Sequence, residues 1–461
     1  MEPDSPEAAF VSFIRTWQGE EARIDTPRCI SGTTLYLVRS FDREALQFSF
    51  PVLIHRNLPE ECGLDPVGAD GAAAALIEGI KAEAECRPGL GPLFGKGTTG
   101  SSRYRDTIEP YTIVHSHAAI GTGLWKADDR NFCDAEGIHL ILRGAVPAPQ
   151  SSPEPEPRLI IGHLEYLAET VGSLVSRFPR QRLEPAWLAS LDQKGLRRIL
   201  PHKGLVGFVG DGSHLARSIT RLRPFFRVAG PKQGVNIPFA CPVELGPVEL
   251  ELPASSRTVT GLGIRKREVL AIAGSNAQGK TTFLEGILAG MDDHAPHDGR
   301  ELVVTVQGAQ IAESTNIGLA GADISMFFHA LPPGVSGTVS SAHGMGSGSM
   351  TMAHQVQDAI ARKAPLLIID EDRAAPNLLV RSCLQKEEIT PLSEILAHQK
   401  EKMGDTTLVF AACAMDTLIA QANRIMVLDR HVASAIEVEE FRHRVATLLR
   451  KTADGLSYPD S

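Results

Sequence analysis

Runs of apolar and polar positions divide the first third of the chain. Apolar residues alternate or cluster at residues 35–38 and 47–54, which predicts strands. Residues 69–86 are rich in Ala and contain no Pro, which predicts a helix. Five prolines, with Ser and Glu between them, fill residues 147–157, a composition typical of a stiff, solvated linker. We therefore expect a mixed α+β region over residues 1–146 that ends at this linker.

After the linker, helical patterns give way to alternating strands and helices. Apolar residues recur every three or four positions over 159–178, and residues 184–200 indicate a second helix. Short apolar runs at 204–209, 269–273 and 365–369 have the length of buried strands, and residues 242–252 alternate as strands do. Helix and strand patterns alternate over most of the remaining chain, which is typical of a largely parallel sheet covered by helices. The expected fold class is therefore α/β.

The segment from Gly274 to Thr281 carries the clearest chemical motif. It fits G-x-x-x-x-G-K-[ST] at every required position, between a predicted strand and a predicted helix, which makes a chance match in a Gly-rich turn the weaker alternative. Its glycines let successive backbone N–H groups turn toward phosphate oxygens. Lys280 is expected to reach the β- and γ-phosphates of ATP, and the Thr281 hydroxyl to bind Mg²⁺. The expected nucleotide-binding residues of this segment are Gly274, Ser275, Asn276, Ala277, Gln278, Gly279, Lys280, Thr281 and Thr282.

A second chemical feature is the acidic end of the apolar run at 365–369. Asp370, Glu371 and Asp372 follow this run directly. P-loop enzymes present a carboxylate to Mg²⁺ at the end of such a strand, so Asp370 is expected to hold Mg²⁺ directly or through water. Glu371 is suited to orient and polarise the attacking water as a general base, and with Lys280 it is the expected catalytic residue. The alternative is a solvated acidic loop.

Between these motifs lies a turn rich in Gly and Ser, Ser347-Gly348-Ser349, before a predicted helix. A Ser-Gly turn that opens a helix is a second anion-binding nest. One chain rarely needs two phosphate nests for one nucleotide, whereas two chains arranged head to tail do, because each nest can close on the other chain's ATP. Ser347, Gly348 and Ser349 are therefore expected to contact the nucleotide of a second copy. The alternative is a flexible loop.

The order of these parts resembles the ABC ATPases, with Gly274–Thr281 as Walker A, Ser347-Gly348-Ser349 as the signature and Ile368–Glu371 as Walker B. More narrowly, the chain resembles the soluble predicted ATPases of the ABC class, which carry no transporter domain. The resemblance implies a P-loop fold of ABC type and a homodimer that closes around two ATP molecules and reopens on hydrolysis. Further stretches that carry it are residues 204–213, 237–239, 258–264, 297–304, 323–325 and 346–349, and Asp370-Glu371-Asp372 with Asn377.

The chain departs from the ABC pattern at several positions. Met350 follows the signature turn where the family usually has a small polar residue. Ordinary ABC proteins carry a switch histidine after the strand that follows Walker B, but none follows the predicted strand at 406–410. His398 precedes that strand and is expected at the surface. For stacking on adenine, Phe239 is the candidate. Slow hydrolysis or a different γ-phosphate sensor is consistent with these departures.

Charge is unevenly distributed along the chain. The formal net charge of −9 disfavours non-specific binding of nucleic acid by the whole surface. Residues 177–232, however, hold 12 Lys and Arg against three Asp and Glu, a net +9. Within them, residues 217–227 combine arginines with Phe225 and Phe226, a pattern suited to single-stranded RNA or another anionic partner. The alternative, which we favour, is that both Phe side chains are core and the arginines form a solvated face.

Composition points to a globular protein of the cytoplasm. Hydrophobic residues make up 43% and charged residues 22% of the chain, so neither disorder nor a fibrous class is indicated. No apolar run approaches the roughly 20 residues that span a bilayer, and the N-terminus lacks the pattern of a signal peptide. Seven cysteines are scattered without a Cys-x-x-Cys pair, which disfavours a disulfide framework or a structural zinc site and fits a reducing compartment.

The expected function is hydrolysis of Mg-ATP at a composite dimer interface, coupled to conformational change on a client such as RNA. Two alternatives stay open: a non-hydrolysing ATP-dependent clamp, and a P-loop kinase or phosphotransferase acting on a small molecule. A guanine-specific GTPase is disfavoured because no Asn-Lys-x-Asp follows the acidic strand. The expected organisation is an α+β domain over 1–146, a linker over 147–157, a helical and basic adapter over 158–236, an ABC-type P-loop ATPase domain over 237–435, and a C-terminal helix and tail over 436–461.

Overall fold

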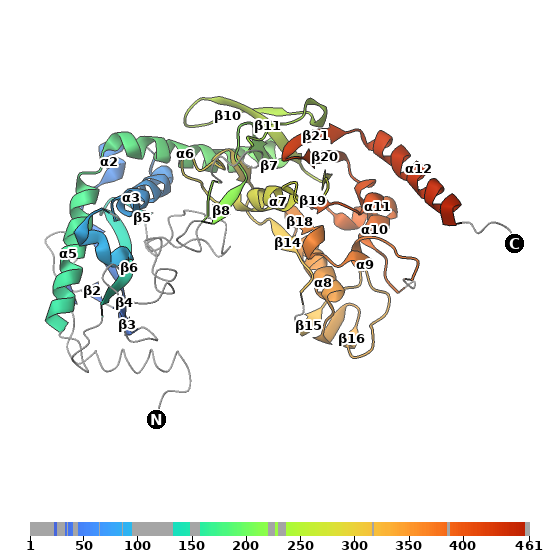
Figure 1. Ribbon diagram of the computed structural model, residues 1–461, viewed down its shortest axis with the longest axis horizontal. Coiled ribbons are helices and arrows are strands. Elements are labelled where there is room, and N and C mark those ends of the chain that lie inside the picture. The colour runs from blue at the N-terminus through green and yellow to red at the C-terminus, as the bar shows by residue number, and fades with distance from the viewer. Residues whose placement is uncertain are drawn as a thin grey trace. The chain divides into compact units, whose positions relative to one another are not determined.

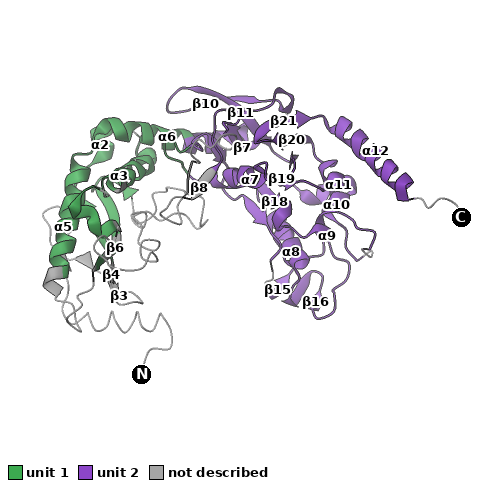
Figure 2. Ribbon diagram, in the orientation of Figure 1, with its two compact units in different colours: residues 1–192, 218–227, 293–298 green, residues 193–217, 228–292, 299–461 purple. Residues whose placement is uncertain are grey.

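The computed structural model of the chain is shown in Figure 1. It divides into two compact units, coloured in Figure 2: unit 1 comprises residues 1–192, 218–227 and 293–298, and unit 2 comprises residues 193–217, 228–292 and 299–461. The division falls inside helix α6 (Arg180–Ile199), and the five-part organisation expected from the sequence stays a prediction. The described residues are 23–24, 33–34, 36–39, 45–63, 65–84, 86–94, 132–147, 157–219, 226–228, 237–315, 318–384 and 388–456.

Unit 1 contains a four-stranded antiparallel sheet and helices that cover it. The sheet order is β3-β4-β6-β5, and the strands and helix expected at 35–38, 47–54 and 69–86 are confirmed with small shifts of their ends. The elements are β1 (Arg23–Ile24), β2 (Thr33–Thr34), β3 (Tyr36–Arg39), β4 (Ala45–Ile54), α2 (Leu58–Cys62), η1 (Pro66–Gly68), α3 (Ala69–Ala84), η2 (Pro88–Phe94), β5 (Phe132–Cys133), β6 (Ile138–Pro147), α5 (Pro157–Ser176) and the first part of α6.

The core of unit 1 follows from the side-chain alternation of its long strands. Successive side chains of a strand point to opposite faces, so Phe48, Phe50 and Val52 of β4 share one face, and all three are buried. Buried residues of α3, α5 and α6 complete this core. Trp187 of α6 is fully buried, and its indole N–H donates to the Asp65 carbonyl at 2.7 Å. A buried indole therefore keeps a hydrogen-bond partner.

Unit 2 is larger and contains two sheets and a short three-stranded meander. Its elements are η4 (Leu200–Lys203), β7 (Leu205–Gly210), η5 (Val243–Leu245), β10 (Val248–Glu251), β11 (Thr258–Arg265), β12 (Val269–Ala273), α7 (Lys280–Ala289), β13 (Val303–Thr305), β14 (Gln310–Ala312), β15 (Gly318–Ala322), β16 (Ser336–Thr338), β17 (Ser341–Met345), α8 (Gly348–Ala361), β18 (Leu366–Asp370), η6 (Glu371–Arg373), α9 (Pro376–Leu379), α10 (Leu392–His398), η7 (Lys400–Met403), β19 (Thr407–Ala412), α11 (Asp416–Ile419), β20 (Arg424–Asp429), β21 (Val432–Ile436) and α12 (Val438–Leu456). The short strands β8 (Arg217–Ile219) and β9 (Phe226–Val228), most of whose residues belong to unit 1, pair with each other.

A six-stranded sheet in the order β14-β18-β19-β12-β20-β21 forms the centre of unit 2. All neighbouring pairs are parallel except β20 and β21, so the largely parallel sheet expected from the sequence is confirmed. Every residue of β12, β18 and β19 is buried, because helices or a second sheet cover both faces. Leu270 and Ile272 of β12 belong to one core, whereas Val269, Ala271 and Ala273 belong to the other. Parallel strands end at one edge of the sheet, which brings the phosphate loop after β12 near the acidic end of β18.

A second, antiparallel sheet in the order β10-β11-β7-β13 shares a core with one face of the parallel sheet. Two parts of it were expected from the sequence, at 204–209 and within 242–252, where β7 and β10 form. The meander β15-β17-β16 was not expected at all, because its Gly- and Ser-rich strands have low intrinsic strand preference. Strand β17 ends at Met345, two residues before Ser347, so the meander leads directly into the signature turn.

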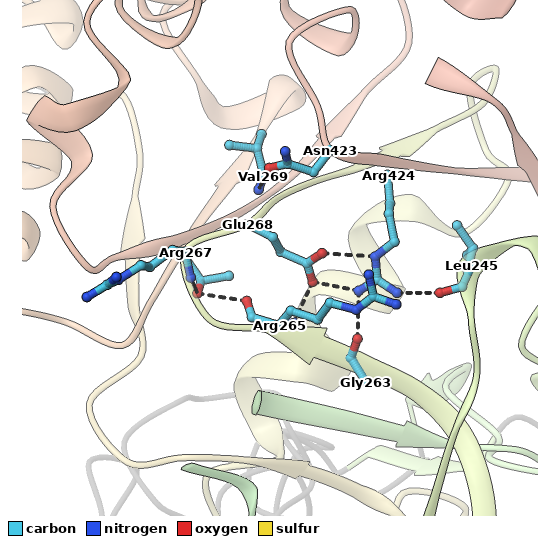
Figure 3. Close-up of polar contacts among 9 residues, drawn as sticks. Leu245, Gly263, Arg265, Arg267, Glu268, Val269, Asn423 and Arg424 are labelled. Carbon is cyan, nitrogen blue, oxygen red and sulfur yellow. Dashed lines mark hydrogen bonds and ion pairs between the residues drawn. The ribbon is translucent and has the colours of Figure 1, made fainter. Parts of the chain in front are cut away.

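A buried ion pair connects the two sheets of unit 2 (Figure 3). The Arg424 guanidinium at the start of β20 donates to both carboxylate oxygens of Glu268, at 2.9 and 2.6 Å, and to the carbonyls of Leu245 and Gly263, each at 2.6 Å. The backbone N–H of Arg265 also donates to Glu268. Arg424 is 9% and Glu268 6% exposed at the side chain, so both charges are satisfied within the protein. This network fixes β11 and η5 against the ends of β12 and β20.

Candidate nucleotide-binding site

The loop between β12 and α7 has the backbone conformation that a phosphate cradle requires. Gly274, Ala277 and Gly279 all have positive φ, at 142°, 62° and 95°. A Cβ on Gly274 would lie 2.3 Å from the Leu428 carbonyl oxygen, so only glycine fits there. Ala277 holds a left-handed conformation that costs an L-residue roughly 1 kcal/mol or more, and such strain is common at functional sites. The first and sixth positions of the motif thus need glycine, while the fourth accepts a strained alanine.

Lys280 is the first residue of α7 and is folded into the loop. Its ammonium donates to the carbonyls of Gly274 at 2.8 Å and Ser275 at 2.9 Å, and the residue is 8% exposed. The loop itself is braced by Gln278, whose side-chain N–H donates to the Asn276 carbonyl at 3.2 Å. The positive charge is therefore held inside the curve of the loop, where a phosphate chain would lie.

Thr281 and Asp370 meet across the sheet edge. The Thr281 hydroxyl donates to Oδ2 of Asp370 at 2.7 Å, and Asp370 is 3% exposed. Two hard oxygen ligands on a helix N-terminus and a strand end suit Mg²⁺, which is usually held by one or two protein oxygens together with substrate phosphates and water. The described residues contain no group of three or more His, Cys, Asp or Glu that could hold a metal. The residues present fit Mg-ATP.

Glu371 contacts the loop that follows β19. One of its carboxylate oxygens, Oε2, accepts the backbone N–H groups of Cys413 and, at 3.3 Å, Ala414. These residues lie where the sequence comparison with ordinary ABC proteins expects a histidine. The carboxylate of Glu371, the expected general base, is therefore held by backbone N–H groups at the position where ordinary ABC proteins carry a histidine. Sequence reasoning could not find this contact, because every non-proline residue carries a backbone N–H.

Arg373 adds a positive charge beside the acidic strand, which sequence reasoning missed. Its guanidinium contacts Glu313 at 2.9 Å and Glu285 at 3.4 Å. The hydrogen bond to Glu313 raises the pKa of Arg373 above its usual value, partial burial acts in the opposite direction, and the charges of Glu313, Glu285 and Asp370 raise it further. Arg373 therefore stays fully charged and balances part of the negative charge in this region.

The signature turn is built against two other loops of the same chain. Ser347 is exposed and is the N-cap residue of α8, without a side-chain capping bond. A Cβ on Gly348 would lie 1.9 Å from the Ser314 hydroxyl, so glycine lets the turn pack closely against Ser314. The Ser349 hydroxyl donates to the Asn377 side chain at 2.7 Å, while Met350 is 1% exposed in the core. Met350 thus departs from the family pattern because it packs inward.

Hydrogen bonds connect the expected site residues in separate groups. Gly274, Ser275 and Lys280 share one set of bonds and Thr281 pairs with Asp370, whereas Ser349 is bonded to Asn377. Phe239 is 7% exposed and its ring lies 5.4 Å from that of Phe283, so it packs in the core and does not present a face to adenine. His398 is exposed at the end of α10, as expected. Thr282 is partly buried in the first turn of α7.

The basic segment at 217–227 falls largely outside the described residues. Arg221, Arg223 and Phe225 are among the residues that are not described, and only the backbone of β8 and β9 is described on either side. The interpretation of this segment therefore stays a prediction. Among the described residues, no helix is both long and apolar enough to cross a membrane.

The parallel sheet, the phosphate loop and the Thr281–Asp370 pair define a P-loop nucleotide-binding protein. Residues 179–455 match the ABC_ATPase family over its P-loop domain, and the chain belongs to this family. The resemblance seen in the sequence and the expected fold class are thereby confirmed.

The chain is similar to several known proteins. The uncharacterized protein MJ1628 of Methanocaldococcus jannaschii is 38% identical over 380 residues, which are 82% of this chain and 82% of that protein. The structure of CbiO1 from Clostridium perfringens, part of the ABC transporter complex CbiONQ, is similar over 45% of this chain and 93% of its own, with 14% identity and a TM-score of 0.29. A bacterial Atm1-family ABC exporter with ATP bound is similar over 68% of this chain and 54% of its own, with 13% identity and a TM-score of 0.29.

Proposed function

We propose that the protein binds Mg-ATP at Gly274–Thr282 and hydrolyses it to drive a conformational change on a client. The observation that carries this proposal is the 2.7 Å contact between the Thr281 hydroxyl and Asp370, with Glu371 next to it in the chain. This contact supports the proposal that Thr281 and Asp370 are a ligand pair for Mg²⁺ beside the phosphate loop, with Glu371 as a candidate general base. Membership of the ABC ATPase family supports hydrolysis over phosphate transfer to a small molecule.

Each residue has a distinct role in this proposal. Backbone N–H groups of the loop and Lys280 bind the β- and γ-phosphates. Thr281 and Asp370 would hold Mg²⁺, which when bound neutralises developing charge on the phosphate oxygens. Glu371 orients the attacking water and accepts its proton, while the N–H groups of Cys413 and Ala414 keep the carboxylate in position. The cradle, the metal ligands and the base then lie within one edge of the sheet.

A homodimer would complete the site. Ser347 is exposed at the N-terminus of a 14-residue helix, so its turn is available to the phosphates bound by a second copy. The Ser349 hydroxyl is bonded to Asn377, which keeps the turn in shape before a partner arrives. A kinase would not need this turn for activity. Variants of Ser347 therefore separate the composite ATPase from the kinase alternative.

We propose that the protein acts in the cytoplasm. Among the described residues, the cysteines Cys62, Cys86, Cys133, Cys241, Cys383 and Cys413 are all free. Free cysteines fit a reducing compartment, where disulfides are rare.

The first test concerns Lys280. Replacing it with Ala is expected to weaken ATP binding roughly 10- to 150-fold, because a charge-assisted bond worth about 1.5–3 kcal/mol is lost. Isothermal titration calorimetry measures the effect on Kd. Lys402, an exposed lysine of η7 in the same unit, provides the matched control, and its replacement by Ala should leave Kd unchanged. An unaltered Kd in Lys280→Ala would remove this loop from the nucleotide site.

A second test concerns the client. If residues 217–227 bind RNA, replacing Arg221, Arg223 and Arg227 with Ala should weaken binding and flatten its salt dependence, because fewer counterions are released. Binding to a single-stranded oligonucleotide is measured at several salt concentrations. A triple Ala variant at Arg444, Arg450 and Lys451 of α12 removes the same formal charge elsewhere. If the unmutated protein binds no RNA at low salt, the arginines form a solvated face.

A further inference from the structure

The turn between β20 and β21 has an unusual backbone for its residues. Asp429 pairs with Val432, so the hairpin is closed by two residues, Arg430 and His431. Both have left-handed φ, at 47° and 66°. A two-residue turn of this kind normally takes Asn or Gly, because a left-handed conformation costs other residues roughly 1–2 kcal/mol each. The chain thus places an arginine and a histidine where the backbone alone would favour Asn-Gly.

This hairpin touches the phosphate loop at three points. The backbone N–H of Arg430 donates to the side-chain oxygen of Gln278. The His431 ring lies beside Gly279, with Nδ1 3.1 Å from the position that a Cβ on this glycine would occupy. Before the turn, the Leu428 carbonyl oxygen lies 2.3 Å from the position that a Cβ on Gly274 would occupy. The hairpin therefore packs against the nucleotide-binding loop, and it brings the imidazole of His431 beside this loop.

The strand order gives the direction in which a bound nucleotide would run. Asp370 follows β18, which lies on one side of β12, whereas β20 and the hairpin lie on the other side. The metal ligands Thr281 and Asp370 mark the end of the site that receives the β- and γ-phosphates. The sugar and base must then leave the loop away from this end. The hairpin lies on the side of β12 away from this end.

We propose that His431 contacts the sugar or base of the bound nucleotide and so contributes to recognition of a nucleoside. This inference rests on the proposed nucleotide binding at Gly274–Thr282. An imidazole can stack on a base and can exchange hydrogen bonds with a ribose hydroxyl. Phe239 is buried against Phe283 and does not compete for this role. His431 is only partly buried, which leaves ring surface open to a ligand.

The test compares a nucleotide with its phosphate chain alone. Kd is measured for ATP and for inorganic tripolyphosphate, each with Mg²⁺, in the unmutated protein and in His431→Asn. Asn tolerates the left-handed conformation of the turn, so the hairpin is retained while the ring is removed. We expect ATP affinity to fall about 5- to 100-fold, the range for losing a side chain that stacks on a base, and tripolyphosphate affinity to stay the same. His443→Ala, which removes an exposed imidazole from α12, should change neither Kd.

Two results would overturn the inference. Equal losses of affinity for ATP and tripolyphosphate would mean that His431 only supports the loop through Gly279. An unchanged ATP Kd in His431→Asn would mean that the ring does not touch the nucleotide. His431→Gly, which relieves the turn further, repeats the comparison if the Asn variant is poorly folded. If the unmutated protein binds neither ligand, the proposed function itself fails, a result distinct from both.

Discussion

Replacing Glu371 with Gln is expected to lower ATP turnover about 10²–10⁴-fold while ATP binding persists. Gln keeps an oxygen that can accept the N–H groups of Cys413 and Ala414, so the side chain stays in place. It loses the charge that polarises the attacking water. Steady-state phosphate release gives the turnover, and calorimetry shows whether Kd for ATP is retained. Asp372→Asn, which removes an exposed carboxylate from the neighbouring residue, is the matched control and should have a small effect.

The same variant is expected to accumulate as a closed dimer. ATP would bridge Lys280 of one chain and Ser347 of the other, and without hydrolysis this bridge persists. Size-exclusion chromatography with light scattering, run with ATP and Mg²⁺, should show a dimer that the nucleotide-free protein forms less completely. Adding Ser347→Arg to Glu371→Gln should return it to monomer, because bulk is placed where the partner's phosphate must lie.

The two contrary outcomes differ in what they contradict. A Glu371→Gln protein that stays monomeric at saturating ATP refutes the composite site, and the kinase alternative then gains support. A protein that is dimeric with and without ATP contradicts only the dependence of dimerisation on nucleotide. The assignments of Lys280 and Glu371 would survive that second result.

Replacing Arg424 with Met is expected to destabilise unit 2 by about 3–5 kcal/mol, because removing one partner leaves a buried charge uncompensated. Glu268, 6% exposed, would lose both of its guanidinium bonds, and the carbonyls of Leu245 and Gly263 would lose their donor (Figure 3). For a unit of this size, the loss corresponds to a fall in Tm of roughly 6–20 °C. Differential scanning calorimetry measures the shift.

An exposed ion pair of the same unit supplies the control. The Arg267 guanidinium and the Asp405 carboxylate lie 2.5 Å apart, and their side chains are 69% and 73% exposed. Surface ion pairs of this kind contribute at most about 1 kcal/mol to the free energy of unfolding. Asp405→Asn should therefore leave Tm nearly unchanged. The double variant Glu268→Leu/Arg424→Met should recover much of the loss, because no buried charge is left unpaired. If Arg424→Met matches Asp405→Asn in Tm, the buried network does not hold the two sheets together.

The sequence by itself determined the parts whose signal is local. The phosphate loop could be read from Gly274, Lys280 and Thr281, because a tight turn, a charge and a hydroxyl must stand at fixed spacing between a strand and a helix. The strands at 269–273 and 365–369 were predicted within one residue at each end, since continuous apolar runs of that length are buried on both faces of a parallel sheet. These features depend on neighbours in the chain.

Only the tertiary structure decided which distant segments meet. The contacts of Glu371 with Cys413 and Ala414, and of the β20–β21 turn with Gln278, use backbone groups that leave no mark in a sequence. The Glu268–Arg424 pair joins residues 156 positions apart, and nothing local selects these two among the charges of the chain. The meander before Ser347 forms although its residues favour turns, because strand pairing and packing outweigh weak intrinsic preferences. Local chemistry thus gave the nucleotide motif, whereas long-range packing gave the residues that surround it.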